Sequence, residues 1–358
     1  MPTGFHKLRI VDVADETDDA ITLMLEPEIA DRGVFSFTPG QHLTLRALIG
    51  EEDVRRNYSL CVPPSAGKLR VAIKKVRGGL FSGWAQDALK PGGTIESMAP
   101  RGHFTWTFEP GARRNYVAFA GGSGITPVLS LIASGLATEP ESSFTLLYGN
   151  RASNSIMFLE ELAALKNRHM GRLQIYHFLT AEADDVELLN GRLDAERIAQ
   201  VLSSIVDPKA VDVVFICGPG GMMDAAERAM IDAGVDPDRV LVERFTSGRV
   251  VPEETEEHRA AARQAEGVPV QVTLDGRRRR IAFHADSGNI LDSARAAGLP
   301  APYACKAGVC ATCRAKLISG RVHMAANYGL SKEEVAQGYI LTCQSVPESD
   351  DVMVDYDA

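Results

Sequence analysis

Four of the six cysteines in this chain fall into one pattern close to its C-terminal end. Cys305, Cys310 and Cys313 are spaced C-x4-C-x2-C in the stretch YACKAGVCATC, and Cys343 follows in LTCQS. The N-terminal segment has no apolar run behind basic residues, and no stretch is apolar for long enough to span a membrane, so we expect a cytoplasmic chain. In a reducing compartment, cysteines clustered in this way indicate a metal site rather than disulfides.

The cysteine spacing matches the plant-type [2Fe-2S] pattern, in which a tight loop supplies three thiolates and a distant cysteine supplies the fourth. Zinc is the alternative, but structural zinc sites usually take their ligands as two C-x2-4-C pairs. Gly308 and several alanines in the loop would let backbone N–H groups approach the sulfur atoms. The sequence therefore predicts that the metal ligands of a [2Fe-2S] cluster are Cys305, Cys310, Cys313 and Cys343.

The residues around the cysteines predict an α+β domain of the β-grasp type over residues 268–358. VPVQVTLDGRRRRIAFHA is typical of a β-hairpin, NILDSARAAG of a helix, and CRAKLISGRV of another strand pair. The one basic run, Arg277 to Arg280, directly follows Asp275-Gly276, so it is interpreted as a solvated hairpin tip. A docking patch for an acidic partner is the alternative for this run.

A chain of 358 residues is too long for one typical core, so two or three domains are expected. The segment VVPEETEEHRAAARQAEG is charged, rich in Ala and Glu, and lacks an evident apolar face. We interpret residues 249–267 as a linker that would let the cysteine-containing domain move between a donor and an acceptor. A partly helical spacer that fixes this domain is the alternative.

Residues 111–248 alternate between apolar runs and amphipathic stretches, which indicates an α/β domain with a parallel sheet covered on both faces. Its first strand leads into GGSGITP, where Gly121, Gly122 and Gly124 would let the backbone approach a pyrophosphate at a helix N-terminus. Taken alone, such a turn serves packing as often as binding, and Pro127 stands at the third glycine position of the dinucleotide fingerprint.

Two further strand ends of this domain carry candidate ligand-binding residues. The second strand ends in YGNR, where no acidic residue is available for a ribose 2′-hydroxyl and Arg151 could meet a 2′-phosphate, so NADPH is favoured over NADH. The fourth ends in FICGPGGMM, which brings Cys217 to the same sheet edge. A small buried hydrophobe is the alternative role for Cys217.

Residues 1–110 consist of short alternating segments broken by Gly, Pro and Asp, which predicts an antiparallel Greek-key β-barrel. RRNYSL places Arg56, Tyr58 and Ser59 on a single strand, and GGLFS adds Gly79 and Ser82 about twenty residues later. A cation, an aromatic ring, hydroxyls and exposed backbone are the groups that a flavin nucleotide would need. Each of them could also be surface decoration.

The order of these motifs along essentially the whole chain resembles the ferredoxin-NADP reductase superfamily joined to a C-terminal plant-type ferredoxin. The resemblance implies that FAD lies on the R-x-Y-S strand, with Ser59 near the flavin N5 and Tyr58 along the ring. It also implies that Gly79 and Ser82 bind the FAD pyrophosphate, and it makes Arg56 and Lys74 cofactor-binding candidates.

The same resemblance assigns the coenzyme loop and the residues near the nicotinamide. Glu243 and Phe245, in ERF, match the segment that closes over the flavin. Thr180-Ala181 departs from the Ser-Arg pair that many NADPH-specific members carry, so Arg151 would hold the 2′-phosphate largely alone. The remaining matches are to the G-[ST]-G-x-x-P loop and the C-G-P segment, and comprise Gly122, Ser123, Gly124, Thr126, Pro127, Cys217, Gly218 and Pro219.

The resemblance implies a cytoplasmic oxidoreductase that passes electrons from NADPH to FAD, then to the [2Fe-2S] cluster and on to an oxygenase. Ser59, Cys217 and Glu243 would be its catalytic residues. Several segments are most similar to the reductase components that serve a multisubunit di-iron oxygenase. No nucleic-acid partner is expected, since the formal net charge is -9, and no membrane partner is expected, since no stretch is apolar for long enough. Alternatives are another steroid, aromatic or alkane oxygenase as partner, NADH as donor, a redox sensor or scaffold, and a plain NADPH oxidase.

Overall fold

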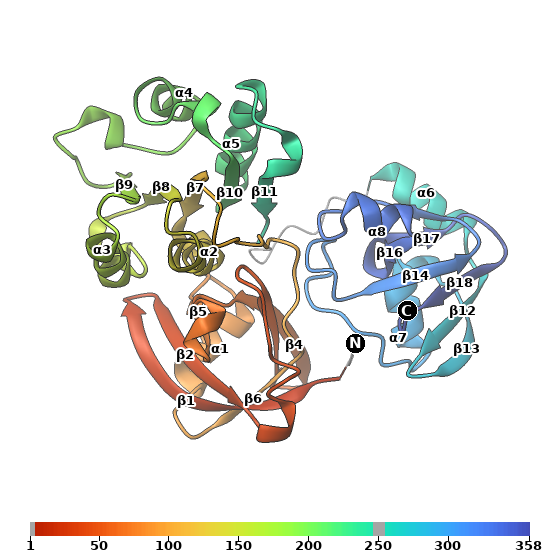
Figure 1. The fold of residues 1–358 in the computed structure, drawn as a ribbon. Helices are drawn as coiled ribbons and strands as arrows, with labels where there is room; N and C mark the ends of the chain where they lie inside the picture. The colour runs from red at the N-terminus through yellow and green to blue at the C-terminus, as the bar shows by residue number, and fades with distance from the viewer. Residues whose placement is uncertain (1–3, 246–254) are drawn as a thin grey trace.

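The computed structural model describes residues 4–245 and 255–358, which form three units. We refer to residues 6–97 as the barrel unit, residues 115–243 as the parallel-sheet unit, and residues 256–355 as the cysteine unit. The parallel-sheet unit lies above the barrel unit in Figure 1, and the cysteine unit lies beside both. None of the helices in the two described ranges is long and apolar enough to cross a membrane.

The barrel unit is built on one antiparallel sheet, as the alternating segments predict. Its elements are β1 (His6–Thr17), β2 (Ala20–Pro27), β3 (His42–Ile49), β4 (Glu52–Ser59), β5 (Leu69–Lys74), α1 (Leu80–Ala88) and β6 (Thr94–Ser97). The strand order is β4-β3-β6-β1-β2-β5, and the insertion of β6 between β1 and β3 is a Greek-key connection. A bridge between Leu60 and Val71 closes the sheet, around a core that includes Leu23 and Leu45.

The parallel-sheet unit confirms the expected α/β architecture. Its elements are β7 (Asn115–Gly121), α2 (Ile125–Thr138), β8 (Ser143–Asn150), α3 (Leu159–Arg168), β9 (Leu173–Leu179), α4 (Ala195–Ser204), β10 (Val213–Cys217), α5 (Gly220–Asp232) and β11 (Val240–Glu243). The strand order is β11-β10-β7-β8-β9. The chain adds β8 and β9 on one side of β7 and then β10 and β11 on its other side, so the switch point lies between β7 and β10. Ligands bind at such a switch point, beyond the carboxyl ends of the strands.

Both faces of the parallel sheet are buried, but by different parts of the chain. On β7, Tyr116 and Ala118 join the core that contains α2 and α3, whereas Val117 and Phe119 join the core that contains α4 and α5. The first of these cores also contains Cys61, Ala72 and Phe104, from or next to the barrel unit. The barrel and parallel-sheet units are therefore joined by a continuous apolar core.

The cysteine unit has a separate core and a mixed sheet. Its elements are α6 (Glu256–Gln264), β12 (Pro269–Leu274), β13 (Arg277–Ala282), α7 (Ile290–Ala296), β14 (Arg314–Ser319), β15 (Val322–Met324), α8 (Lys332–Ala336), β16 (Tyr339–Leu341), β17 (Ser345–Pro347) and β18 (Val352–Asp355). The main sheet has the order β13-β12-β18-β14-β16, with β12 and β18 parallel. The expected β12–β13 hairpin and helix α7 are present.

Two expectations for this unit need correction. CRAKLISGRV does form two strands, but β14 pairs with β16 and β18 while β15 pairs with β17, so the two strands do not pair with each other. The arginine run is not the hairpin tip: Asp275 and Gly276 make the turn with positive φ angles, and Arg277 to Arg280 form the exposed edge strand β13.

The segment interpreted as a flexible linker is different where the structure describes it. Residues 256–264 form helix α6, and the Thr255 hydroxyl caps it by accepting a hydrogen bond from the His258 N–H at 3.2 Å. Ala262 and Ala265 belong to the core of the cysteine unit. The packing of α6 against this core could not be predicted from the sequence, because only alanines and one histidine face the core. The expected domain boundary at residue 248 and the first part of the linker lie outside the described residues.

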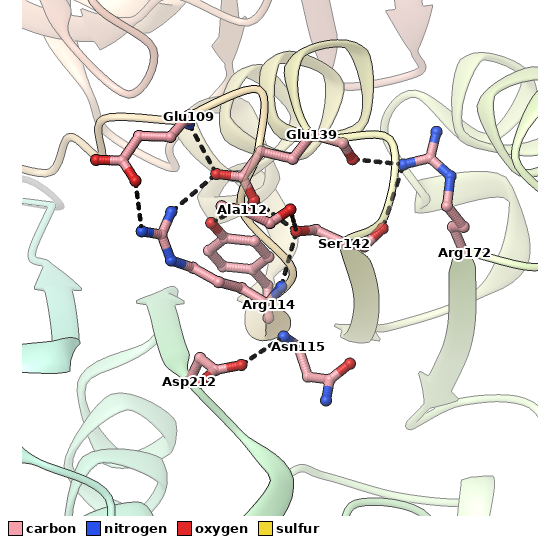
Figure 2. A network of polar contacts seen from close by, with 9 residues as sticks. Glu109, Ala112, Arg114, Asn115, Glu139, Ser142, Arg172 and Asp212 are labelled. Carbon is pink, nitrogen blue, oxygen red and sulfur yellow. Dashed lines mark hydrogen bonds and ion pairs between the residues drawn. The ribbon is translucent and has the colours of Figure 1, made fainter.

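A buried carboxylate fixes the start of the parallel-sheet unit (Figure 2). Glu139, which follows α2, is fully buried and accepts hydrogen bonds from the Tyr116 hydroxyl at 2.9 Å and the Ser142 hydroxyl at 2.6 Å. Its other oxygen accepts from the Arg114 guanidinium and from the Glu109 N–H, both at 2.9 Å. The carboxylate thus ties the chain before β7 to the end of α2 and the start of β8.

We expect Glu139→Ala to lower the free energy of unfolding by about 3 to 5 kcal/mol, since it leaves several buried donors without an acceptor. Glu139→Gln, which keeps one acceptor oxygen, should cost less. Urea unfolding followed by circular dichroism measures the change. Glu141→Ala, at an exposed position in the same loop, is the matched control. An unchanged midpoint for Glu139→Ala would show that the network does not contribute to stability.

Candidate active site between the three units

A cavity of about 340 Å³ lies where the three units meet. The barrel unit contributes most of its wall, the parallel-sheet unit contributes the loop before α2 and the end of β11, and the cysteine unit contributes part of its loop. Of the residues predicted from the sequence, those that line it are Arg56, Tyr58, Ser59, Lys74, Gly79, Ser82, Ser123, Thr126, Glu243, Phe245, Cys305 and Cys310. The cavity therefore unites flavin, coenzyme and cluster candidates that lie far apart in the chain.

The last residues of β4 present the flavin candidates. The Tyr58 ring lies on Phe81 at a centroid distance of 5.6 Å, which holds it against the cavity wall. Ser59 is almost fully buried, and its hydroxyl has no hydrogen-bond partner among the described residues. An orphaned buried hydroxyl is costly unless a ligand satisfies it. This hydroxyl therefore fits a ligand atom such as a ring nitrogen of the flavin.

The turn before α1 forms the other end of the same wall. A Cβ on Gly79 would lie 2.6 Å from the Ser82 hydroxyl oxygen and 3.0 Å from the Val76 Cβ, so a side chain here would displace groups of the turn. The Ser82 hydroxyl accepts the Val76 N–H at 3.0 Å, so in this structure it stabilises its own turn. Lys74 lines this cavity and a second one, and its ammonium lies 3.4 Å from Asp19.

The coenzyme loop is pressed against the end of β10. A Cβ on Gly124 would lie 2.1 Å from the Cys217 carbonyl oxygen, and a Cβ on Gly218 would lie 2.9 Å from the Gly121 nitrogen. The carboxyl ends of β7 and β10 can meet this closely only with glycine at these positions. Cys217 itself is fully buried and lines neither cavity, and burial raises the pKa of its thiol. Its predicted role near the nicotinamide stays a prediction.

The second cavity, of about 750 Å³, lies beyond the carboxyl ends of β7 and β8. Of the residues predicted for the dinucleotide site, Gly122, Arg151 and Pro219 line it, and so does Thr180, which departs from the family pattern. Arg192 lines it as well, and sequence reasoning missed this residue. Two arginines therefore line one cavity at the switch point of the sheet.

Glu243 and His42 lie between the flavin candidates and the cysteine loop. Their side chains approach to 3.9 Å, and both line the first cavity and a smaller crevice of about 130 Å³ that also reaches Cys310. Burial, with a smaller contribution from Cys310, raises the pKa of Glu243 to about 8, and burial lowers the pKa of His42 to about 4. Near neutral pH the two groups are thus mostly uncharged, so their contact is not an ion pair.

The four cysteines of the pattern lie together in the cysteine unit, in two pairs. Cys305 interacts with Cys310, and Cys313 interacts with Cys343. This pairing fits a two-iron cluster, in which each iron takes two thiolates. Within residues 4–245 and 255–358, no three or more His, Cys, Asp or Glu residues are grouped so that they could hold a single metal ion.

The cysteine loop is shaped to surround such a cluster. The N–H groups of Ala307 and Cys310 point at the Cys305 sulfur at 3.3 and 3.4 Å. The loop curls because Lys306, Gly308 and Ala311 all have positive φ angles. At Gly308 a Cβ would lie 2.9 Å from the Ala326 carbonyl oxygen, so glycine is required there. These features fit a [2Fe-2S] cluster bound by the four thiolates.

Three family models match the chain, one for each unit. They are the oxidoreductase FAD-binding domain over residues 7–106, the oxidoreductase NAD-binding domain over residues 119–228, and the 2Fe-2S iron-sulfur cluster binding domain over residues 272–348. The match over residues 272–348 supports the iron-sulfur cluster rather than the zinc alternative.

Several proteins of known function are similar over almost the entire length. The chain is 43% identical to one of the subunits of the 1,2-phenylacetyl-CoA epoxidase of Escherichia coli, over 99% of both chains. It is 36% identical to the ferredoxin reductase component of the 3-ketosteroid-9-alpha-monooxygenase of Mycobacterium tuberculosis, over 99% of this chain and 98% of the relative. The glycine betaine monooxygenase reductase subunit of Pseudomonas aeruginosa is 31% identical over 99% and 96%.

Solved structures show the same arrangement of units. Phthalate dioxygenase reductase, described as a modular structure for electron transfer from pyridine nucleotides to [2Fe-2S], is 25% identical, with a TM-score of 0.58 and 98% of both chains covered. An intact type IV self-sufficient cytochrome P450 monooxygenase has a TM-score of 0.71 at 24% identity, and the match covers 98% of this chain and 41% of that one. The second likeness concerns the fold alone.

Proposed function

Because this chain belongs to the family of oxygenase reductase components that combine FAD-binding, NAD-binding and [2Fe-2S] domains, we propose that it carries electrons from NADPH to the oxygenase that epoxidises phenylacetyl-CoA. The observation that carries the proposal is 43% identity over 99% of both chains to a component of that epoxidase. The cavity shared by the three units supports the electron order, since flavin, coenzyme and cluster candidates all line it.

Bound FAD would accept a hydride as an electron pair, and a bound [2Fe-2S] cluster would pass electrons on one at a time. The residues of the chain supply binding and orientation. Tyr58 and Ser59 would hold the flavin ring, while the loop at Gly124 would seat the nicotinamide against it. Closure of this cavity by Phe245 would keep water from the reacting atoms.

In this proposal Glu243 lies between the flavin candidates and the cysteine loop. It lines the cavity beside the flavin candidates and also the crevice that reaches Cys310. Its raised pKa, about 8, lets the carboxyl group hold a proton near neutral pH, and its Oε1 lies 3.9 Å from the Nδ1 of His42. We therefore assign Glu243 the role of a proton holder beside the flavin site.

The coenzyme preference in this proposal depends on the two arginines of the second cavity. A 2′-phosphate between Arg151 and Arg192 would accept charge-assisted hydrogen bonds, whereas the 2′-hydroxyl of NADH could not neutralise both guanidinium groups. We expect Arg151→Ala and Arg192→Ala each to cost about 1.5 to 3 kcal/mol of NADPH binding, which raises its KM by about 10- to 100-fold. The KM for NADH should change little.

Steady-state ferricyanide reduction with each coenzyme measures this effect. Arg168→Ala, at the exposed end of α3, is the control for loss of a surface arginine. An unchanged KM for NADPH in both cavity variants would mean that the 2′-phosphate does not lie between these arginines. The two arginines would then give no reason to expect NADPH rather than NADH as the donor.

The proposed partner is a multisubunit di-iron oxygenase, and reconstitution tests it. The FAD- and cluster-loaded protein would be mixed with the phenylacetyl-CoA oxygenase subunits, NADPH and air, and ring-epoxide formation compared with NADPH consumption. Tight coupling supports the proposal. NADPH oxidation that yields only peroxide would reject this oxygenase and favour another partner, for which the 36% identical 3-ketosteroid monooxygenase reductase indicates the first alternative.

A further inference from the structure

The cysteine unit contacts the barrel unit through a cluster of aromatic and cationic side chains. The Arg55 guanidinium carbon lies 4.2 Å from the centroid of the Tyr303 ring, and that of Arg295 lies 4.3 Å from the same ring. The Arg55 guanidinium carbon also lies 4.9 Å from the centroid of the Phe5 ring, just before the barrel unit. Cation–π contacts of this kind contribute most when they are shielded from water.

Hydrogen bonds fix the same contact from both sides. An Arg55 Nη1–H donates to the Tyr303 carbonyl at 3.4 Å, and the Tyr303 hydroxyl donates to the Asp53 carbonyl at 3.3 Å. The other guanidinium nitrogens of Arg55 donate to the Asp53 carboxylate at 3.0 and 2.6 Å. Arg55 is only 6% exposed. The guanidinium is thus preorganised to receive the tyrosine ring.

The ion pairs between the cysteine unit and the rest of the described chain are more exposed than this contact. Lys332 and Asp238 are 3.3 Å apart with side chains that are 86% and 81% exposed, and His103, which is half exposed, faces Glu334. Exposed pairs contribute little to association. Arg55 is buried and Tyr303 is half-buried, and arginine and tyrosine side chains are among those that dominate protein interfaces.

The position of the contact in the chain connects it to both redox sites. Arg55 directly precedes Arg56 on β4, the strand that ends in Tyr58 and Ser59. Tyr303 stands two residues before Cys305, which lines the first cavity together with the flavin candidates. Any shift of the Tyr303–Arg55 contact would therefore move the cluster loop relative to the flavin strand.

We propose that the contact between Tyr303 and Arg55 is a docking latch that holds the loop of Cys305 and Cys310 against the first cavity and so sets the rate of electron transfer between the two cofactors. This inference rests on the proposed function, because it concerns the step between FAD and the cluster. Tyr303 and Arg55 act as positioning residues, since neither lines the cavity.

The test is rapid mixing of the FAD- and cluster-loaded full chain with NADPH in the absence of oxygen, with flavin and cluster reduction followed separately. For Tyr303→Ala we expect cluster reduction to slow by about 10- to 100-fold, since misplacement by about 1 Å can cost a factor of this size. Flavin reduction and the visible spectrum of the cluster should be unchanged. Tyr303→Phe keeps the ring and should restore most of the rate.

Lys332→Ala is the control. Lys332 also makes a contact between the cysteine unit and the rest of the chain, but its ion pair with Asp238 is exposed on both sides. Its replacement should leave cluster reduction within about twofold of the unmodified protein, as expected for an exposed contact. A wild-type rate of cluster reduction in Tyr303→Ala would overturn the latch.

Hydrogen exchange of the loaded proteins separates failure of the latch from failure of the proposed function. If the unmodified protein reduced its flavin but never its cluster, the proposed electron order would fail, and the latch would be judged by exchange alone. The latch predicts faster exchange in β4 and in residues 301–305 of Tyr303→Ala, with α2 unchanged. Unchanged exchange in both segments would reject the latch whatever the kinetics.

Discussion

Cys310→Ser is expected to separate the two halves of the electron path. Cys310 is one of the four predicted cluster ligands and also lines the cavity beside the flavin candidates. Loss of this thiolate should prevent correct assembly of the cluster, so reduction of cytochrome c by NADPH should fall by about two orders of magnitude or more. Reduction of ferricyanide, which takes electrons directly from the flavin, should be largely retained.

Both activities would be measured with the same enzyme preparation, together with its iron and FAD content. Cys61→Ser is the matched control, because Cys61 is a buried cysteine outside the pattern. Its sulfur donates to the Arg70 carbonyl at 3.2 Å, a bond that serine can also make. Equal loss of ferricyanide and cytochrome c reduction in Cys310→Ser would count against the order of FAD before the cluster.

A second large effect is expected from Gly124→Ala. The φ angle at Gly124 is -61°, which any residue adopts, so the demand for glycine at this position is purely steric. The added Cβ would lie 2.1 Å from the carbonyl oxygen of Cys217 and 2.5 Å from its carbonyl carbon. Backbone cannot rotate away as a side chain can, so the loop must move off the end of β10.

This displacement should slow NADPH-driven flavin reduction by about 100-fold, as expected when a reacting group is misplaced by about 1 Å. Stopped-flow measurement with saturating NADPH gives the rate, and chemical reduction with dithionite shows whether FAD and cluster are still bound. Gly220→Ala, at a glycine with open space around its Cβ position, should behave like the unmodified protein. Normal flavin reduction in Gly124→Ala would mean that the loop does not seat the nicotinamide.

The architecture could be predicted from the sequence because each unit has its own periodicity. Alternating residues predict the antiparallel strands of the barrel unit, and continuous apolar runs such as VVFIC predict the buried parallel strand β10. The cysteine spacing predicts the loop of Cys305, Cys310 and Cys313. These features are local, so a short stretch of the chain is enough to indicate them.

The parts that the sequence does not predict depend on contacts between distant segments. Nothing around His42 in GQHLTL indicates that it lies 3.9 Å from Glu243, about two hundred residues away in the chain. Arg192 follows a glycine in an irregular stretch, and only the fold brings it to the same cavity as Arg151. The role of Tyr303 could not be predicted either. A tyrosine near a cysteine loop indicates nothing by itself, and only the fold brings Arg55 into contact with its ring.

The arginines of β13 matter for how copies of this chain behave toward one another. β13 is an outer strand of its sheet, and an outer strand has backbone N–H and C=O groups that can pair with another strand. Four consecutive exposed arginines would bring like charges together in any such pairing. The basic run therefore protects the cysteine unit against edge-to-edge aggregation, including in partly unfolded molecules that have lost their cofactors.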